Sequence, residues 1–193
     1  MSRPLDFTGI STFYFLFTVK DGFIYDFACK KSWQRLEWLH MVRLTDEKER
    51  KFNTLAREIL SCADYEQLKG FMAHGRITLY SHSVDVARLS LKLAGNKEID
   101  EEDLVKGALL HDFYLYDWHD ARIDVPLFQM HGFTHPFTAY SEASKRFELD
   151  EKAKNIIESH MWPLTLFTIP KSKEAWLVCL ADKLVAARET FTR

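Results

Sequence analysis

Residues 105–112 of the chain, VKGALLHD, decide the predicted fold because a polar pair ends an apolar helical pattern there. Leu104 and Ala108 are four residues apart, so they share one face of a predicted helix. His111 and Asp112 follow Ala108 by three and four residues and fall on the same apolar side. The pattern predicts a helix over residues 101–112 that points an imidazole and a carboxylate into the interior.

The chain after residue 31 keeps this helical period, with apolar residues recurring at intervals of three and four. Glycine and proline are sparse, and where they occur they separate helical segments. Pro136 is expected at the first position of its helix. The sequence thus predicts an all-α helical bundle, with helices over residues 32–43, 46–70, 81–94, 101–112, 136–147, 150–161 and 173–190.

Residues 1–30 differ from this pattern. Two aromatic-rich runs, FYFLFTV and FIYDFAC, flank Lys20-Asp21-Gly22, and Asp-Gly between such runs is a hairpin signal. We expect either a short β-hairpin or an irregular extension over residues 1–30, followed by one helical domain over residues 31–193. The longest apolar run, residues 9–19, is too short to cross a bilayer, so no membrane partner is expected.

The composition excludes several classes of protein. The 193 residues include 26 Lys plus Arg and 28 Asp plus Glu, a net charge of −2, which disfavours a dedicated binder of nucleic-acid polymers. The 3 cysteines are odd in number and form no Cys-x-x-Cys motif. This usage favours a reducing compartment, and we expect a cytoplasmic protein without a thiolate zinc site.

Four further predicted helices each carry one polar residue on an apolar stripe: His82, His135, His160 and Asp182. Asp182 is the most informative, because its neighbours four residues away, Val178 and Ala186, are apolar. A buried carboxylate costs several kcal/mol unless it is paired or binds a metal. A shared metal site would neutralise the whole set at once.

The ligand types narrow the choice of metal. Imidazoles and carboxylates without thiolates suit Fe, Mn, Co, Ni or Zn. Six protein ligands (His82, His111, Asp112, His135, His160 and Asp182) exceed what one open catalytic ion needs. We therefore expect two divalent transition-metal ions, bridged by the carboxylate of Asp112.

The order His82, His111-Asp112, Asp182 resembles the HD-domain superfamily of metal-dependent phosphohydrolases across roughly residues 76–190. TLYSHSVDVARLSLKLA is similar to the first ligand helix of that family, VKGALLHD to its signature, and CLADKLVAA to its last ligand helix. The resemblance implies an HD domain over residues 31–193, with His135 and His160 at the positions of second-metal ligands in binuclear members. The chain lacks a GYP triplet and has Tyr116 where a lysine is common, so it is most similar to small stand-alone bacterial HD proteins.

The resemblance implies hydrolysis of a small phosphate ester or a nucleotide by a metal-activated water. Asp112 and Lys183 are the expected catalytic residues, with the lysine offsetting charge on the phosphate. His119, Arg122 and His131, in the predicted loop 117–135, are expected to contact the substrate. His131 is also the main rival of His135 as a ligand, and it lacks the helical stripe that favours His135.

Two alternatives stay open at this point. Some HD-domain proteins carry four histidines and two aspartates on a di-iron centre and oxidise C–H bonds with dioxygen, and ligand identity cannot separate that chemistry from hydrolysis. A sensor module with a silent metal site is the third interpretation. Lost ligands would favour it, whereas the chain retains the whole set.

Overall fold

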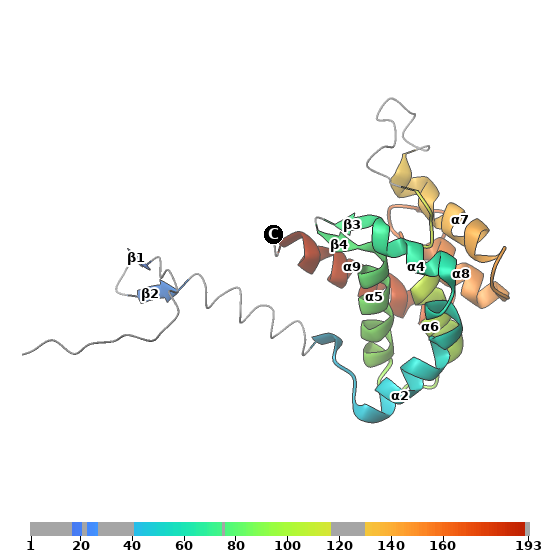
Figure 1. Cartoon of the computed structure of the whole chain (residues 1–193), viewed down its shortest axis with the longest axis horizontal. Helices are drawn as coiled ribbons and strands as arrows, with labels where there is room; N and C mark the ends of the chain where they lie inside the picture. The colour runs from blue at the N-terminus through green and yellow to red at the C-terminus, as the bar shows by residue number, and fades with distance from the viewer. Residues whose placement is uncertain (1–16, 21–22, 27–40, 75, 117–129, 192–193) are drawn as a thin grey trace, which may run out of the picture. The chain divides into compact units, whose positions relative to one another are not determined.

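The computed structural model describes residues 17–20, 23–26, 41–74, 76–116 and 130–191, and the chain divides into two units, Met1–His40 and Met41–Arg193 (Figure 1). In the first unit, strand β1 (Phe17–Lys20) pairs antiparallel with strand β2 (Phe23–Asp26), with Phe17 opposite Asp26. The expected hairpin is therefore confirmed. The predicted helix over residues 32–43 lies almost wholly outside the described residues.

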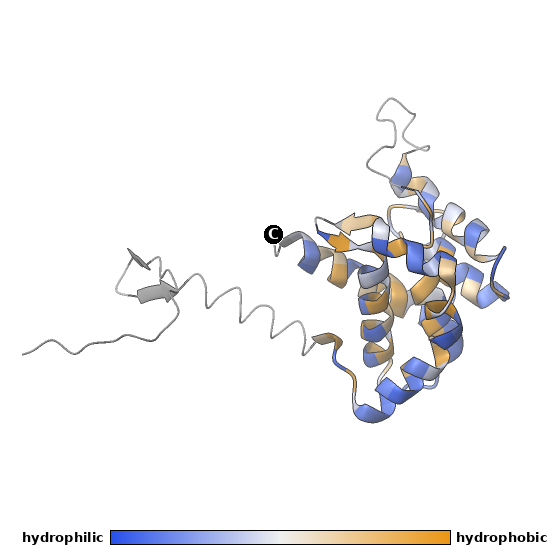
Figure 2. Cartoon of the chain, in the orientation of Figure 1, coloured by the Kyte–Doolittle hydropathy of each residue, from blue (hydrophilic) through white to orange (hydrophobic). Residues whose placement is uncertain are grey.

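The second unit confirms the helical bundle. Helix α5 (Leu79–Ala94) packs against α6 (Glu101–Leu110) and α9 (Lys173–Phe191). Helix α8 (Glu151–Ser159) contacts α6, α9 and α7 (His131–Ala143). Figure 2 shows apolar residues concentrated inside the bundle and hydrophilic residues along α2 (Asp46–Leu55). No helix within the described ranges is both long enough and apolar enough to span a membrane.

Side-chain caps define where three of these helices begin. The Thr78 hydroxyl accepts a hydrogen bond from the Ser81 amide at the start of α5. Asp100 caps α6, and the Asp150 carboxylate accepts from the Ala153 amide at the start of α8. Such caps satisfy amides that have no partner within the helix, so they fix the first turn and the phase of the residues that follow.

Gly107 lets α6 approach α8 closely. A Cβ atom at Gly107 would lie 2.5 Å from Cγ2 and 2.8 Å from Cβ of Ile156, closer than carbon atoms pack. Both helices end shortly after this crossing, at His111 and His160. The missing side chain therefore allows the two helix ends, and their histidines, to meet.

The prediction of one helix over residues 46–70 is wrong. This segment forms α2, two short helices α3 (Arg57–Leu60) and α4 (Ala63–Glu66), and the 3-10 turn η1 (Gln67–Gly70). Cys62 has an extended backbone between α3 and α4. The break lets the buried Tyr65 donate its hydroxyl to the Leu109 carbonyl at 3.0 Å, so tertiary packing overrides the local helical period.

Two further elements differ from the prediction. Strands β3 (Met72–His74) and β4 (Ile77–Thr78) form an antiparallel pair, although only a break was expected there. Helix α7 begins at His131, so Pro136 lies inside it and not at its first position. His131 is therefore helical, one turn before His135, and the expectation that it sits in a loop is wrong.

Candidate metal centre

Six polar side chains from five helical segments meet in the interior of the second unit. His82 lies in α5, Asp182 in α9 and His135 near the start of α7. His111 and His160 are the C-cap residues of α6 and α8. The four histidines and Asp182 are buried, and the Asp112 side chain is 13% exposed.

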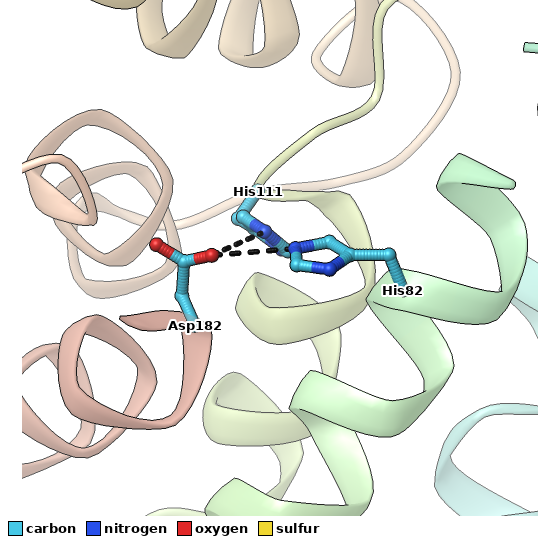
Figure 3. A group of neighbouring side chains, drawn as sticks. All are labelled: His82, His111 and Asp182. Carbon is cyan, nitrogen blue, oxygen red and sulfur yellow. Dashed lines mark ion pairs between the residues drawn. The ribbon is translucent and has the colours of Figure 1, made fainter. Parts of the chain in front are cut away.

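The first group of ligand atoms comes from α5, α6 and α9 (Figure 3). The His82 Nε2 atom lies 3.3 Å from Asp182 Oδ1, and the His111 Nε2 atom lies 3.8 Å from the same oxygen. Figure 3 shows both rings directed at this carboxylate. The three side chains face a common point and could hold one ion.

The second group comes from α7 and the end of α8. The Nε2 atoms of His135 and His160 are 2.9 Å apart. The Asp112 Oδ1 atom lies 3.3 Å from His135 Nε2 and 3.5 Å from His160 Nε2. These three residues form a second convergent set beside the first.

Asp112 lies between the two groups and turns one oxygen toward each. While Oδ1 faces His135 and His160, Oδ2 lies 3.5 Å from His111 Nε2 and 3.8 Å from His82 Nε2. A carboxylate in this position can bind one metal ion through each of its two oxygens.

Backbone carbonyls orient three of the four histidine rings. Because a carbonyl oxygen only accepts, the ring Nδ1 atom in each pair is the donor, which leaves Nε2 unprotonated in the neutral ring and free to bind an ion. The pairs are His111 with the Ala108 carbonyl (2.7 Å), His135 with the His131 carbonyl (2.8 Å) and His160 with the Ile157 carbonyl (2.7 Å).

Glu189 orients the fourth ring, and the sequence analysis missed it. The His82 Nδ1 atom lies 3.0 Å from Glu189 Oε2, and Glu189 is 4% exposed. Glu189 follows Asp182 by seven residues on α9, which is about two helical turns and places both on one face. That spacing is the signal that could have identified it.

Two histidines bind protons more tightly than an ordinary imidazole. Burial lowers the pKa of His82, but hydrogen bonds to Asp182 and Glu189 outweigh it, and the pKa is raised well above its usual value. Burial likewise lowers the pKa of His135, and the Asp112 carboxylate reverses this and raises it. Protons therefore occupy positions that a cation would take over.

The pKa values of Asp112, Asp182 and His160 are all lower than usual. Burial raises the pKa of Asp112 and of Asp182, yet the surrounding imidazoles hold both pKa values below the usual range. Burial and the neighbouring imidazoles lower the pKa of His160 to about 3, so this ring stays neutral. The cluster combines two anionic carboxylates with imidazole nitrogens, which is a donor set for a divalent transition metal.

Unsatisfied polar atoms also fit a metal site. His111 Nε2 and Asp112 Oδ1 are buried and make no hydrogen bond within the described part of the chain. A bound ion would satisfy both atoms, which otherwise carry a desolvation cost. Two overlapping groups have ligand atoms within 4.8 Å of one another and could hold an ion: His82, His111 and Asp182, and His111, Asp112 and His160.

The residues predicted to contact substrate are only partly described. The Lys183 Nζ atom donates to the His160 carbonyl at 2.7 Å and lies 3.8 Å from Asp182 Oδ2. His131 stacks on the His135 ring at a centroid distance of 4.6 Å and lines the pocket above the cluster. His119 and Arg122 lie outside the described residues.

The comparisons with known proteins agree with this arrangement. The family model of the HD domain matches residues 79–187, more than half of the chain, and the matched segment contains all six cluster residues. Comparisons with curated proteins and with solved structures found no match. The chain therefore belongs to the HD-domain family, which is part of a superfamily of metal-dependent hydrolases.

Proposed function

We propose that the protein is a metal-dependent phosphohydrolase that acts on a small phosphate ester or a nucleotide at a binuclear centre. The observation that carries the proposal is the position of Asp112. Its two oxygens face two separate groups of imidazole nitrogens, as a bridging carboxylate requires.

The two proposed sites divide the six residues between them. The first ion would be held by His82, His111, Asp182 and Asp112 Oδ2, and the second by His135, His160 and Asp112 Oδ1. Ions of Fe, Mn, Co, Ni or Zn in these sites would activate a water and offset negative charge on a phosphoryl oxygen.

The protein itself orients the histidine rings and supplies one positive charge, on Lys183. The carbonyl hydrogen bonds hold three rings in place, so the centre needs little rearrangement during a reaction. The Lys183 ammonium lines the pocket beside Asp182, where it donates to the His160 carbonyl at 2.7 Å and to Cys179 Sγ at 3.4 Å, and its positive charge would offset charge on a phosphate. In the proposed reaction a water oxygen bonds to phosphorus, the ester P–O bond breaks, and the proton of water passes to the leaving alcohol.

Metal analysis combined with a substrate panel tests the proposal. Protein purified without added metal is expected to contain close to two transition-metal ions per chain and to release phosphate from nucleotides or phosphomonoesters under anaerobic conditions. Protein stripped with a chelator should lose this activity and regain it on addition of one of the proposed metals. A stoichiometry of one ion with full activity would contradict the binuclear mechanism.

The di-iron oxygenase stays the second candidate, because the pocket walls above the cluster are largely apolar and would suit a substrate oxidised at carbon. Oxygen-dependent turnover that requires reduced iron, without phosphate release, would favour it over hydrolysis.

We also propose that the protein works in the cytoplasm on a small phosphorylated substrate. Within the described residues, Cys62 and Cys179 are free thiols, which fits a reducing compartment. The near-neutral net charge supports a small-molecule substrate over a nucleic-acid polymer.

A further inference from the structure

The pocket that opens onto the cluster has a volume of about 750 Å³. Asp112, His135, His160 and Asp182 all line it, so a ligand in the pocket can reach the candidate metal centre. A cavity of this size accommodates an organic group of ordinary metabolite size as well as a phosphate.

The walls of this pocket are mostly apolar. They come from the start of α7, the segment after α8, strand β3 and helix α9, and include Met130, Met161, Pro163, Leu164 and Ala186. Leu164 lies over the first turn of α7, since a Cβ atom at Gly132 would be 3.3 Å from Leu164 Cδ2. This proximity places the leucine side chain, which is 45% exposed, at the pocket wall beside α7.

Positive charge is scarce among the described residues that line the pocket. Among the described lining residues, Lys183 is the only lysine or arginine. A polyphosphate chain carries several negative charges and is ordinarily bound by several cationic groups. One lysine beside a metal centre matches a single phosphoryl group.

Building on the proposed phosphohydrolase function, we infer that the substrate is a phosphomonoester with an apolar organic part. The phosphate would lie against the cluster and Lys183, and the organic part would occupy the apolar walls. Polyphosphates and phosphates of small polar alcohols are poor substrates on this account. Beyond the metal centre, the described walls offer a polyphosphate one lysine for its remaining phosphates, and a small polar alcohol leaves the apolar walls unfilled.

Binding and turnover test this inference separately. Calorimetry on metal-loaded protein compares 1-naphthylmethylphosphonate with methylphosphonate, which carries the same anion without the apolar group. We expect the naphthyl compound to bind on the order of 10- to 100-fold more tightly, because it buries roughly 100 Å² more apolar surface. In turnover, 1-naphthylmethyl phosphate, whose leaving group is an alkyl alcohol like that of glycerol phosphate, should have the highest kcat/KM, ahead of glycerol phosphate and ATP.

Two lysine substitutions, one in the pocket wall and one outside it, test whether the preference for a naphthyl group arises in this pocket. Leu164→Lys places a cation in the pocket wall and should reduce the naphthyl preference at least about fivefold while improving kcat/KM for ATP. Leu166→Lys is the matched control, since Leu166 is 65% exposed and is not among the pocket-lining residues. Leu166→Lys should leave both the naphthyl preference and the kcat/KM for ATP unchanged.

The outcomes separate this inference from the proposed function. Equal binding of the two phosphonates, preferred turnover of ATP or glycerol phosphate, or equal effects of the two lysine variants would overturn the assigned substrate class while leaving hydrolysis intact. No phosphate release from any ester would refute the hydrolase itself. In that case a retained naphthyl preference in binding, lost in Leu164→Lys, would still support the apolar pocket.

Discussion

Glu189→Gln is expected to weaken binding of the first metal ion without disturbing the fold. Glu189 is buried on α9 and its Oε2 atom lies 3.0 Å from His82 Nδ1. An imidazole held by a carboxylate presents its other nitrogen in a fixed direction and is a stronger ligand for a metal ion. Glutamine keeps the shape of the side chain and removes the charge.

The size of the effect follows from this one contact. A hydrogen bond to a charged group contributes about 1.5–3 kcal/mol, and loss of such an outer partner lowers metal affinity roughly 10- to 100-fold. Glutamine can still accept through its amide oxygen, so we expect a loss of about tenfold, and a larger one for Glu189→Ala.

The pH of the measurement matters because Glu189 has two opposing effects. Burial lowers the pKa of His82, but hydrogen bonds to Asp182 and Glu189 raise it overall, so a proton competes with the metal in the wild-type protein. Removing the carboxylate lessens this competition. The loss of affinity should therefore be largest at alkaline pH, where the His82 proton is already gone, and smaller near neutrality.

Competition with a calibrated chelator across this pH range measures the affinity, and thermal unfolding of the metal-free protein checks the fold. Glu174→Gln is the matched control. Glu174 is a second buried carboxylate on α9, but its Oε1 atom accepts from the Asp100 amide at 2.7 Å, at the start of α6. Wild-type metal affinity in Glu189→Gln at alkaline pH, or an equal loss in Glu174→Gln, would refute the orienting role of Glu189.

The remaining predictions concern the cluster and the helix crossing beneath it. Asp182→Ala should abolish phosphate release and lower metal content by elemental analysis, while circular dichroism of the metal-free protein stays close to wild type. His160→Ala should lose mainly the second ion and cut turnover by orders of magnitude, and near-normal turnover with one bound ion would exclude a binuclear mechanism. Apparent metal affinity of the wild type should rise with pH, since an ion must displace the proton of His82, and a flat profile in chelator competition would contradict this. Gly107→Ala should reduce the free energy of unfolding by about 1–3 kcal/mol in a denaturant titration, because its Cβ would meet Ile156; an unchanged midpoint would show that α6 and α8 can separate at no cost.

Local sequence was sufficient to predict most helices of the bundle and the polar residues that interrupt their apolar faces. Helical periodicity is a property of the backbone, so a buried stripe that contains His82 or Asp182 can be recognised without the partner helix. The cost of burying an unpaired carboxylate then identifies Asp182 as a residue that needs a counterpart. The family resemblance followed from the same residues and is confirmed by the match over residues 79–187.

The tertiary structure decided what depends on contacts between segments far apart in the chain. The break near Cys62 follows from packing of Tyr65 against Leu109, and Pro136 lies inside α7, against its local preference for a first turn. The partnership of Glu189 with His82 joins residues 107 positions apart, and only the packing of α9 against α5 brings them together. Periodicity tells which way a side chain faces within its own helix, whereas the side chain that it meets is set by how the helices pack.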